Sequence, residues 1–265
     1  MVIFANDFAK YYPDEMPVKV ISLVPSLTEV FYSFGLGEYI VGITRFCEYP
    51  TLKPNLPAII GGTKNPSIDR IKSLTPDVVF ASKEENNKED IELISRFSNV
   101  VVTDIKTIQD NLIFLESVIS CFPVSVGAEN VLKNIRKLYQ FPVIKPLRRA
   151  LYLIWKDPYM TVGKDTFIHE MMGYSGFCNV ADDRLRYPAL EICEIALLKP
   201  EFILLSSEPY PFKEKHLKIL AEEFPDSKVI LVDGAMFSWY GVRPMLAMDY
   251  FEKLYSSLDK SIPEI

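Results

Sequence analysis

Histidine and cysteine are scarce in this chain, which limits the metal sites that it can build. The 265 residues include two histidines, and the four cysteines stand far apart with no C-x-x-C pair. Structural zinc sites draw about four ligands from closely spaced Cys and His. We therefore expect no protein-built metal site, no intrinsic cofactor, and reduced thiols rather than a disulfide framework.

Long apolar runs and an excess of basic residues are also missing. No stretch of about 18 apolar residues is present, so no membrane span is expected. The first residues, MVIFANDFAKYYPDE, lack the basic and apolar regions of a signal peptide. This predicts a cytoplasmic chain, unless an export signal is missing from the sequence. The net charge of −6 argues against nucleic-acid binding.

Short catalytic and nucleotide-binding motifs are absent as well. The chain contains no G-x-G-x-x-G, no Walker A sequence and no G-x-S-x-G, and GGTKNP (61–66) lacks the spacing of a phosphate loop. No nucleophile, histidine and carboxylate stand out as a set, although such sets assemble only in space. We expect a protein that is not an enzyme, with an α/β enzyme as an alternative.

Near-continuous apolar runs alternate with helical patterns along the chain. The runs occupy 18–24, 77–82, 99–104, 149–155, 201–207 and 228–233. Such runs are typical of parallel strands that are covered on both faces. Helical patterns occupy 26–35, 67–74, 87–97, 108–119, 165–173, 189–197, 213–223 and 244–257. The alternation predicts an α/β fold.

Three segments of the first half recur in order in the second half. SLTPDVVFASKE resembles LLKPEFILLSSE, SNVVVTD resembles SKVILVD, and VKVISLVPS resembles ALYLIWKDP. Their ordered recurrence predicts two similar, Rossmann-like lobes with mainly parallel sheets, at 1–121 and 143–265.

The segment between the lobes, 122–142, has the pattern of one long backbone helix. Val126, Val131, Ile135 and Leu138 fall near one helical face, and prolines bound the segment. About 18 helical residues would span roughly 27 Å. This predicts a stiff connection rather than a flexible linker.

Five segments together carry a resemblance to a known family: ISLVPSLTEVFYSFGLGEYIVGITRFCEYP, NPSIDRIKSLTPDVVFASKEEN, YLIWKDPYMTVGKDTFIHEM, LLSSEPYPFKEKH and GAMFSWYG. Across nearly its whole length the chain resembles the substrate-binding proteins of bacterial cobalamin and iron-siderophore ABC importers, the helical-backbone class (class III). The resemblance implies two α/β lobes joined by a helix. The implied ligand is a corrinoid, haem or ferric siderophore, held in the cleft between the lobes for import. The family is extracytoplasmic; a cytoplasmic corrinoid or iron-chelate carrier or sensor is the alternative.

The aromatic loop DGAMFSWYG follows the last apolar run and carries one of only two tryptophans. Its rings either pack in the core or contact a flat ligand. Ligands of open α/β sheets bind beyond the carboxyl ends of the strands. We therefore expect Phe237, Trp239 and Tyr240 to bind ligand.

Other candidate ligand-binding residues also follow predicted strands. In the first lobe, Pro25 and Ser26 open a helix whose Ser26–Glu29 spacing predicts a capping box. Arg45 and Phe46 follow the next apolar run, where the resemblance implies a ring that packs on the ligand. Ser82 departs from the family, which has a tryptophan there in its cobalamin-binding members. The second-lobe candidates are Trp155, Tyr159, Arg184, Arg186, Tyr187 and Tyr210, with His216 expected to be exposed.

The resemblance also implies a permease partner that docks on one acidic residue of each lobe. The internal repeat brings Glu89 and Glu214 to similar places, each near an expected helix start. Negative charge is favourable there. We expect these two side chains to pair with arginines of the permease.

Overall fold

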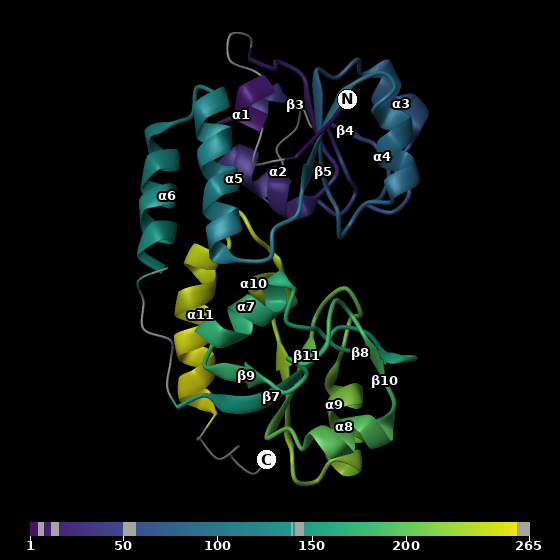
Figure 1. Cartoon of the computed structure of the whole chain (residues 1–265), viewed down its shortest axis with the longest axis vertical. Coiled ribbons are helices and arrows are strands. Elements are labelled where there is room, and N and C mark those ends of the chain that lie inside the picture. Colours follow the sequence, from purple (N-terminus) through teal and green to yellow (C-terminus); the bar gives the residue numbers. More distant parts are fainter. Residues whose placement is uncertain (5–7, 12–15, 50–56, 139, 141–145, 259–265) are drawn as a thin grey trace. The chain divides into compact units, whose positions relative to one another are not determined.

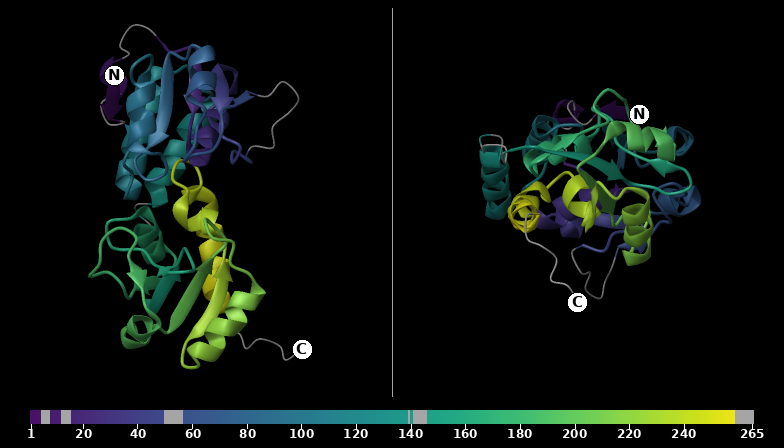
Figure 2. Two further views of the ribbon diagram at one scale, coloured as in Figure 1. Left: turned by 90° about the vertical axis from the view of Figure 1, so that its right-hand side faces the viewer. Right: turned by 90° about the horizontal axis from the view of Figure 1, so that it is seen from below.

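The structure is a computed structural model that describes the chain except residues 5–7, 12–15, 50–56, 139, 141–145 and 259–265. The chain divides into two compact units (Figures 1 and 2). Unit 1 comprises Met1–Tyr139 and Tyr240–Val242, and unit 2 comprises Gln140–Trp239 and Arg243–Ile265. Both are α/β, which confirms the predicted fold class. The lobe boundaries at residues 121 and 143 stay predictions.

Unit 1 is built on a six-stranded sheet in which all neighbours are parallel, in the order β1-β6-β5-β2-β3-β4. Its strands are β1 (Val2–Phe4), β2 (Val20–Ser22), β3 (Ile40–Ile43), β4 (Ala58–Ile59), β5 (Val78–Ser82) and β6 (Asn99–Thr103). Every residue of β5 is buried, as expected for a strand covered on both faces. Its helices are α1 (Phe8–Tyr11), α2 (Pro25–Ser33), the 3-10 turn η2 (Gly37–Tyr39), α3 (Ile68–Ser73), α4 (Lys88–Ile94), α5 (Ile108–Cys121) and α6 (Val126–Leu138).

The predicted helix over 122–142 is shorter in the structure. Helix α6 has 13 residues and lies beside α5 (Figure 1). Phe122 instead ends α5 with extended backbone, and its ring packs against that of Phe31. Val126, predicted on the apolar face, is 82% exposed. The predicted end at Pro142 lies outside the described residues, and the role of α6 as a connecting strut stays a prediction.

Unit 2 contains a four-stranded parallel sheet in the order β12-β11-β7-β9 and an antiparallel pair, β10-β8. Its strands are β7 (Arg148–Leu153), β8 (Tyr159–Met160), β9 (Phe177–Asn179), β10 (Ala189–Leu190), β11 (Phe202–Ser206) and β12 (Lys228–Val232). Its helices are α7 (Phe167–Tyr174), α8 (Ile192–Leu198), α9 (Glu214–Glu223), α10 (Gly234–Ser238) and α11 (Pro244–Ser257). Helix α9 packs against β12, and α7 packs against β9 (Figure 2).

The order of strands explains the repeat in the sequence. The order β6-β5-β2-β3 in unit 1 matches the order β12-β11-β7-β9 in unit 2. The three pairs of similar segments are β2 with β7, β5 with β11, and β6 with β12. Each segment therefore occupies the same place in its own sheet, which confirms the prediction of two similar lobes.

Candidate functional site

Helix α2 begins directly beyond the carboxyl end of β2. Pro25 is its first residue, and the fixed φ of proline suits that position. Ser26 is consequently the second helical residue, so the predicted capping box is wrong: the N-cap is Val24, without a side-chain cap. The buried Ser26 Oγ has no hydrogen-bond partner among the described residues.

Arg45 and Phe46 lie just beyond β3, as predicted. The backbone N–H of Arg45 donates to the carbonyl of Gly61 at 2.9 Å, and its side chain is exposed. The ring of Phe46 is 52% exposed. An aromatic ring that faces water at the end of a parallel strand is available to a ligand.

Asn86 connects two loops of unit 1 and was not among the residues predicted from the sequence. Its Oδ1 accepts from the backbone N–H of Ser82 at 2.8 Å, and its Nδ2 donates to the carbonyl of Thr63 at 2.9 Å. One buried amide thus ties the loop after β5 to the loop after β4. Its location directly after β5 is the one signal that could have singled it out.

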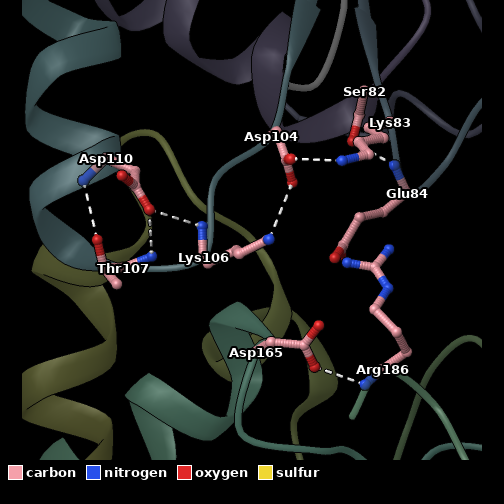
Figure 3. A network of polar contacts seen from close by, with 9 residues as sticks. All are labelled: Ser82, Lys83, Glu84, Asp104, Lys106, Thr107, Asp110, Asp165 and Arg186. Carbon is pink, nitrogen blue, oxygen red and sulfur yellow. Dashed lines mark hydrogen bonds and ion pairs between the residues drawn. The ribbon is translucent and has the colours of Figure 1, made fainter.

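Charged residues follow β5 and β6 (Figure 3). Asp104 pairs with Lys83 at 2.7 Å and with Lys106 at 3.9 Å. Thr107 and Asp110 form the capping box that starts α5. The ion pairs and the capping box fix the conformation of the loop after β6. Exposed ion pairs of this kind contribute little to the free energy of unfolding.

In unit 2 the structure brings several predicted aromatic residues together. Trp155 is 41% exposed, and its ring centroid lies 5.6 Å from that of Tyr210 in an edge-to-face arrangement. Tyr159 and Tyr210 pack against the same hydrophobic core, and Lys156 lies over the Tyr159 ring at 5.9 Å. This geometry is favourable for aromatic pairs and leaves the Trp155 ring partly accessible.

His216 was expected to be exposed, and this expectation is wrong because only 6% of the residue is accessible. Its position in the first turn of α9 brings the ring back onto the start of the helix. There Nδ1 accepts from the backbone N–H of Lys213 at 2.9 Å, and Nε2 lies 3.3 Å from the hydroxyl of Tyr210. Burial, followed by the charges of Lys215 and Lys156, lowers the pKa of His216.

This lowered pKa predicts a loss of stability in acid. The unfolded chain binds the proton first, near the ordinary value of about 6.5, so the contribution of neutral His216 is present above that pH. It is lost as the pH falls through the folded-state pKa. Unfolding by urea between pH 8 and pH 5 measures the effect. In His216→Gln, which keeps an acceptor for Lys213 N–H, the decline should be smaller than in wild type.

His169→Gln is the matched control for this measurement. The ring of His169 lies on α7 and contacts Asn179 at 3.2 Å. If His216→Gln and His169→Gln change the pH dependence equally, His216 is not its source.

The arginines of 184–187 are engaged within unit 2. Arg184 Nη2 donates to Glu194 Oε1 at 3.0 Å, and the guanidinium of Arg186 lies 5.7 Å from the Tyr187 ring. Asp165 accepts from the backbone N–H of Arg186 at 2.5 Å (Figure 3). The segment is thereby anchored by its backbone, and the predicted roles of Arg184, Arg186 and Tyr187 in ligand binding stay predictions.

The three rings of the aromatic loop, at positions 237, 239 and 240, lie in different environments. Trp239 is partly exposed; its Nε1–H donates to Glu208 Oε1 at 2.8 Å, and Arg243 lies 4.9 Å from its ring. Phe237 is 0% exposed and packs on Tyr152 and Phe251.

Tyr240 belongs to unit 1, where it is buried with its hydroxyl 2.9 Å from Thr103 Oγ1. Burial raises the pKa of the Tyr240 hydroxyl far above its ordinary value. Phe237 and Tyr240 both pack in the core of a unit and offer little surface to a ligand, so their predicted roles in ligand binding stay predictions.

Glu89 and Glu214 lie in the first turns of α4 and α9, and both side chains are exposed. The expected location at helix starts is confirmed. Their docking role stays a prediction.

Among the described residues, no cluster of three or more His, Cys, Asp or Glu side chains is placed to bind a metal ion. In the same part of the chain, no helix combines the length and the apolar character that crossing a membrane requires.

Comparison with known sequences gives one family and several relatives. Residues 20–109 match the family described as periplasmic binding protein. The chain is 28% identical over 203 residues to an uncharacterized ABC transporter substrate-binding lipoprotein of Bacillus subtilis (strain 168), covering 71% of this chain but 63% of that protein. It is 27% identical over 199 residues to a vitamin B12-binding protein of Vibrio vulnificus (strain YJ016), covering 71% of each.

Comparison with solved structures extends the similarity to most of the chain. The periplasmic heme-binding protein RhuT from Roseiflexus sp. RS-1, in apo form, has a TM-score of 0.74 at 21% identity, covering 90% of this chain and 98% of that one. At this identity the similarity concerns the fold, and it confirms the two-lobe α/β architecture. The expectation of a cytoplasmic chain has no support here, because the family and the RhuT structure are described as periplasmic and the Bacillus subtilis relative as a lipoprotein.

Proposed function

We propose that this chain, whose residues 20–109 match the periplasmic binding protein family, reversibly binds a metal chelate with a broad, flat face. The candidate classes are a cobalamin-like corrinoid, a haem and a ferric siderophore, delivered to an ABC importer. The metal arrives inside the ligand. Relatives named for vitamin B12 and heme binding support this class of ligand.

The observation that carries the proposal is the accessible aromatic surface beyond the carboxyl ends of parallel strands. In unit 1 this surface is Phe46, which follows β3. In unit 2 it consists of Trp155, which follows β7, and Trp239, which follows β12. Strand ends are where open α/β sheets bind ligands, and flat conjugated ligands stack on such rings.

We expect Trp239→Ala to weaken ligand binding about 10- to 100-fold, because it removes apolar contact area worth a few kcal/mol. Cyanocobalamin, haemin and ferric siderophores are first titrated into the wild type while tryptophan fluorescence is followed. Calorimetry then measures the affinity of each variant for the ligand that binds, since it does not depend on the altered fluorophore.

Leu197→Ala is the control for a general loss of apolar surface. Leu197 is 79% exposed on α8, the helix that leads toward the amino end of β11. Its replacement should leave the affinity unchanged. Equal losses in both variants would contradict a specific role of Trp239, and a wild type that binds none of the ligands would reject the proposed function.

The permease is the second part of the proposal. Glu89 and Glu214 are exposed carboxylates at helix starts, one in each unit, and each would pair with an arginine of the importer. Under this proposal the protein acts outside the cytoplasm.

A further inference from the structure

The partly exposed ring of Trp239 is held by two polar neighbours within unit 2. Its Nε1–H donates to Glu208 Oε1 at 2.8 Å, and the Arg243 guanidinium lies 4.9 Å from the ring centroid. The first contact fixes the edge of the indole, and the second covers part of a face with a buried cation. Together they restrict rotation of the side chain.

Glu208 is itself fixed from several sides. Ser238 Oγ donates to the same Oε1 at 2.8 Å, and the backbone carbonyl of Glu208 accepts from Ser206 Oγ at 2.5 Å. Ser206 in turn accepts from the buried hydroxyl of Tyr152 at 3.0 Å. The carboxylate thus joins the loop after β11 to the end of α10.

Gly234 allows the start of α10 to lie close to the side chain of Glu208. A Cβ at position 234 would lie 2.6 Å from Glu208 Cγ, closer than real Cβ atoms come to their neighbours. A side chain there would push the start of α10 away from Glu208. The absence of a side chain at Gly234 therefore allows the two loops at the carboxyl ends of β11 and β12 to pack closely.

Burial of the Glu208 carboxylate is unfavourable for its charged form. Burial raises the pKa of Glu208, although the hydrogen bonds from Ser238 and Trp239 and the charge of Arg243 act in the opposite direction. A group that favours stability alone would be better replaced by an apolar residue. Its geometry, with two donors on one oxygen, matches a role in orientation.

We propose that Glu208 is a positioning residue, whose carboxylate holds the indole of Trp239 in the one orientation that contacts the ligand. This inference rests on the proposed function, because it assigns Trp239 to the ligand. Holding the ring before the ligand arrives lowers the entropy that binding costs.

The first measurement needs no ligand. Nuclear magnetic resonance of the ¹⁵N-labelled protein resolves the indole N–H groups of the two tryptophans, assigned with Trp155→Phe. Solvent exchange of the Trp239 indole proton should be at least about tenfold faster in Glu208→Ala. It should stay slow in Glu208→Gln, whose amide oxygen accepts the same two bonds. Ser238→Ala is the matched control: it removes the other donor and should leave the indole protected.

The second measurement is affinity for haemin and cyanocobalamin by calorimetry. We expect Glu208→Ala to bind the accepted probe about three- to tenfold more weakly than wild type, and Glu208→Gln to restore most of the loss. Loss of indole protection without loss of affinity would overturn the positioning role, as would an indole that stays protected in Glu208→Ala. If wild type binds neither probe nor any ferric siderophore, the proposed function fails and the positioning role fails with it, whatever the exchange data show.

Discussion

Replacing Phe237 by alanine should lower the free energy of unfolding by about 3–5 kcal/mol, the usual cost of removing a large aromatic ring from a core. Phe237 is fully buried, and its ring centroid lies 4.7 Å from that of Phe251 and 5.1 Å from that of Tyr152. The cavity left behind would lie between α10, α11 and the sheet of unit 2. Urea unfolding followed by far-UV circular dichroism measures the change.

Two further variants test the assignment of Phe237 to the core. Phe237→Leu retains most of the apolar volume and should cost roughly 1–2 kcal/mol. Phe46→Ala removes a ring that is largely exposed and should change stability by no more than about 0.5 kcal/mol. If Phe237→Ala were as stable as wild type and bound ligand poorly, the ring would belong to the ligand site after all.

The long elements were predictable from the sequence because parallel strands covered on both faces read as unbroken apolar runs. The strands β2, β5, β6, β11 and β12 lie within predicted runs, and β7 begins one residue before its predicted run. The missed elements are short or interrupted: β3 contains Gly42, and α10 is a single turn of five residues. Their patterns are too brief to separate a strand or helix from a loop.

Helix α10 also explains why the environments of the three rings in the aromatic loop could not be predicted from the sequence. One helical turn sends Phe237 into the core of unit 2 and leaves Trp239 at the C-cap with its ring partly exposed. Tyr240, one residue later, lies in unit 1. The sequence therefore predicted the same ligand-binding role for all three rings. Their directions depend on the helical turn α10, which the sequence pattern does not reveal.

Polar residues of the candidate site were harder to predict than aromatic ones. His216 was expected to be exposed from its lysine neighbour, yet it turns back onto the backbone N–H of Lys213. Glu208 and Asn86 acquire their roles from partners far along the chain, Trp239 and Thr63. Such pairings arise from the fold, and no spacing in the sequence encodes them.

Asn111 is the most consequential of these distant pairings. It lies buried on α5, where its Nδ2 donates to the carbonyl of Gly241 at 2.9 Å and its Oδ1 accepts from the N–H of Gly241 at 2.6 Å. Gly241 has a φ of +88°, and a Cβ there would collide with Val30, so glycine is required. The amide thus secures residues 240–242 within unit 1.

Asn111→Leu should therefore lower the free energy of unfolding by about 2–5 kcal/mol, because it leaves a buried N–H and a buried carbonyl unpaired. Hydrogen exchange of the Gly241 amide should accelerate together with the loss of stability in urea. Asn134→Leu, on the exposed side of α6, is the matched control and should change stability by about 0.5 kcal/mol or less. If Gly241 stays protected in Asn111→Leu, other contacts, such as that of Tyr240 with Thr103, hold the segment and the amide pairing is dispensable.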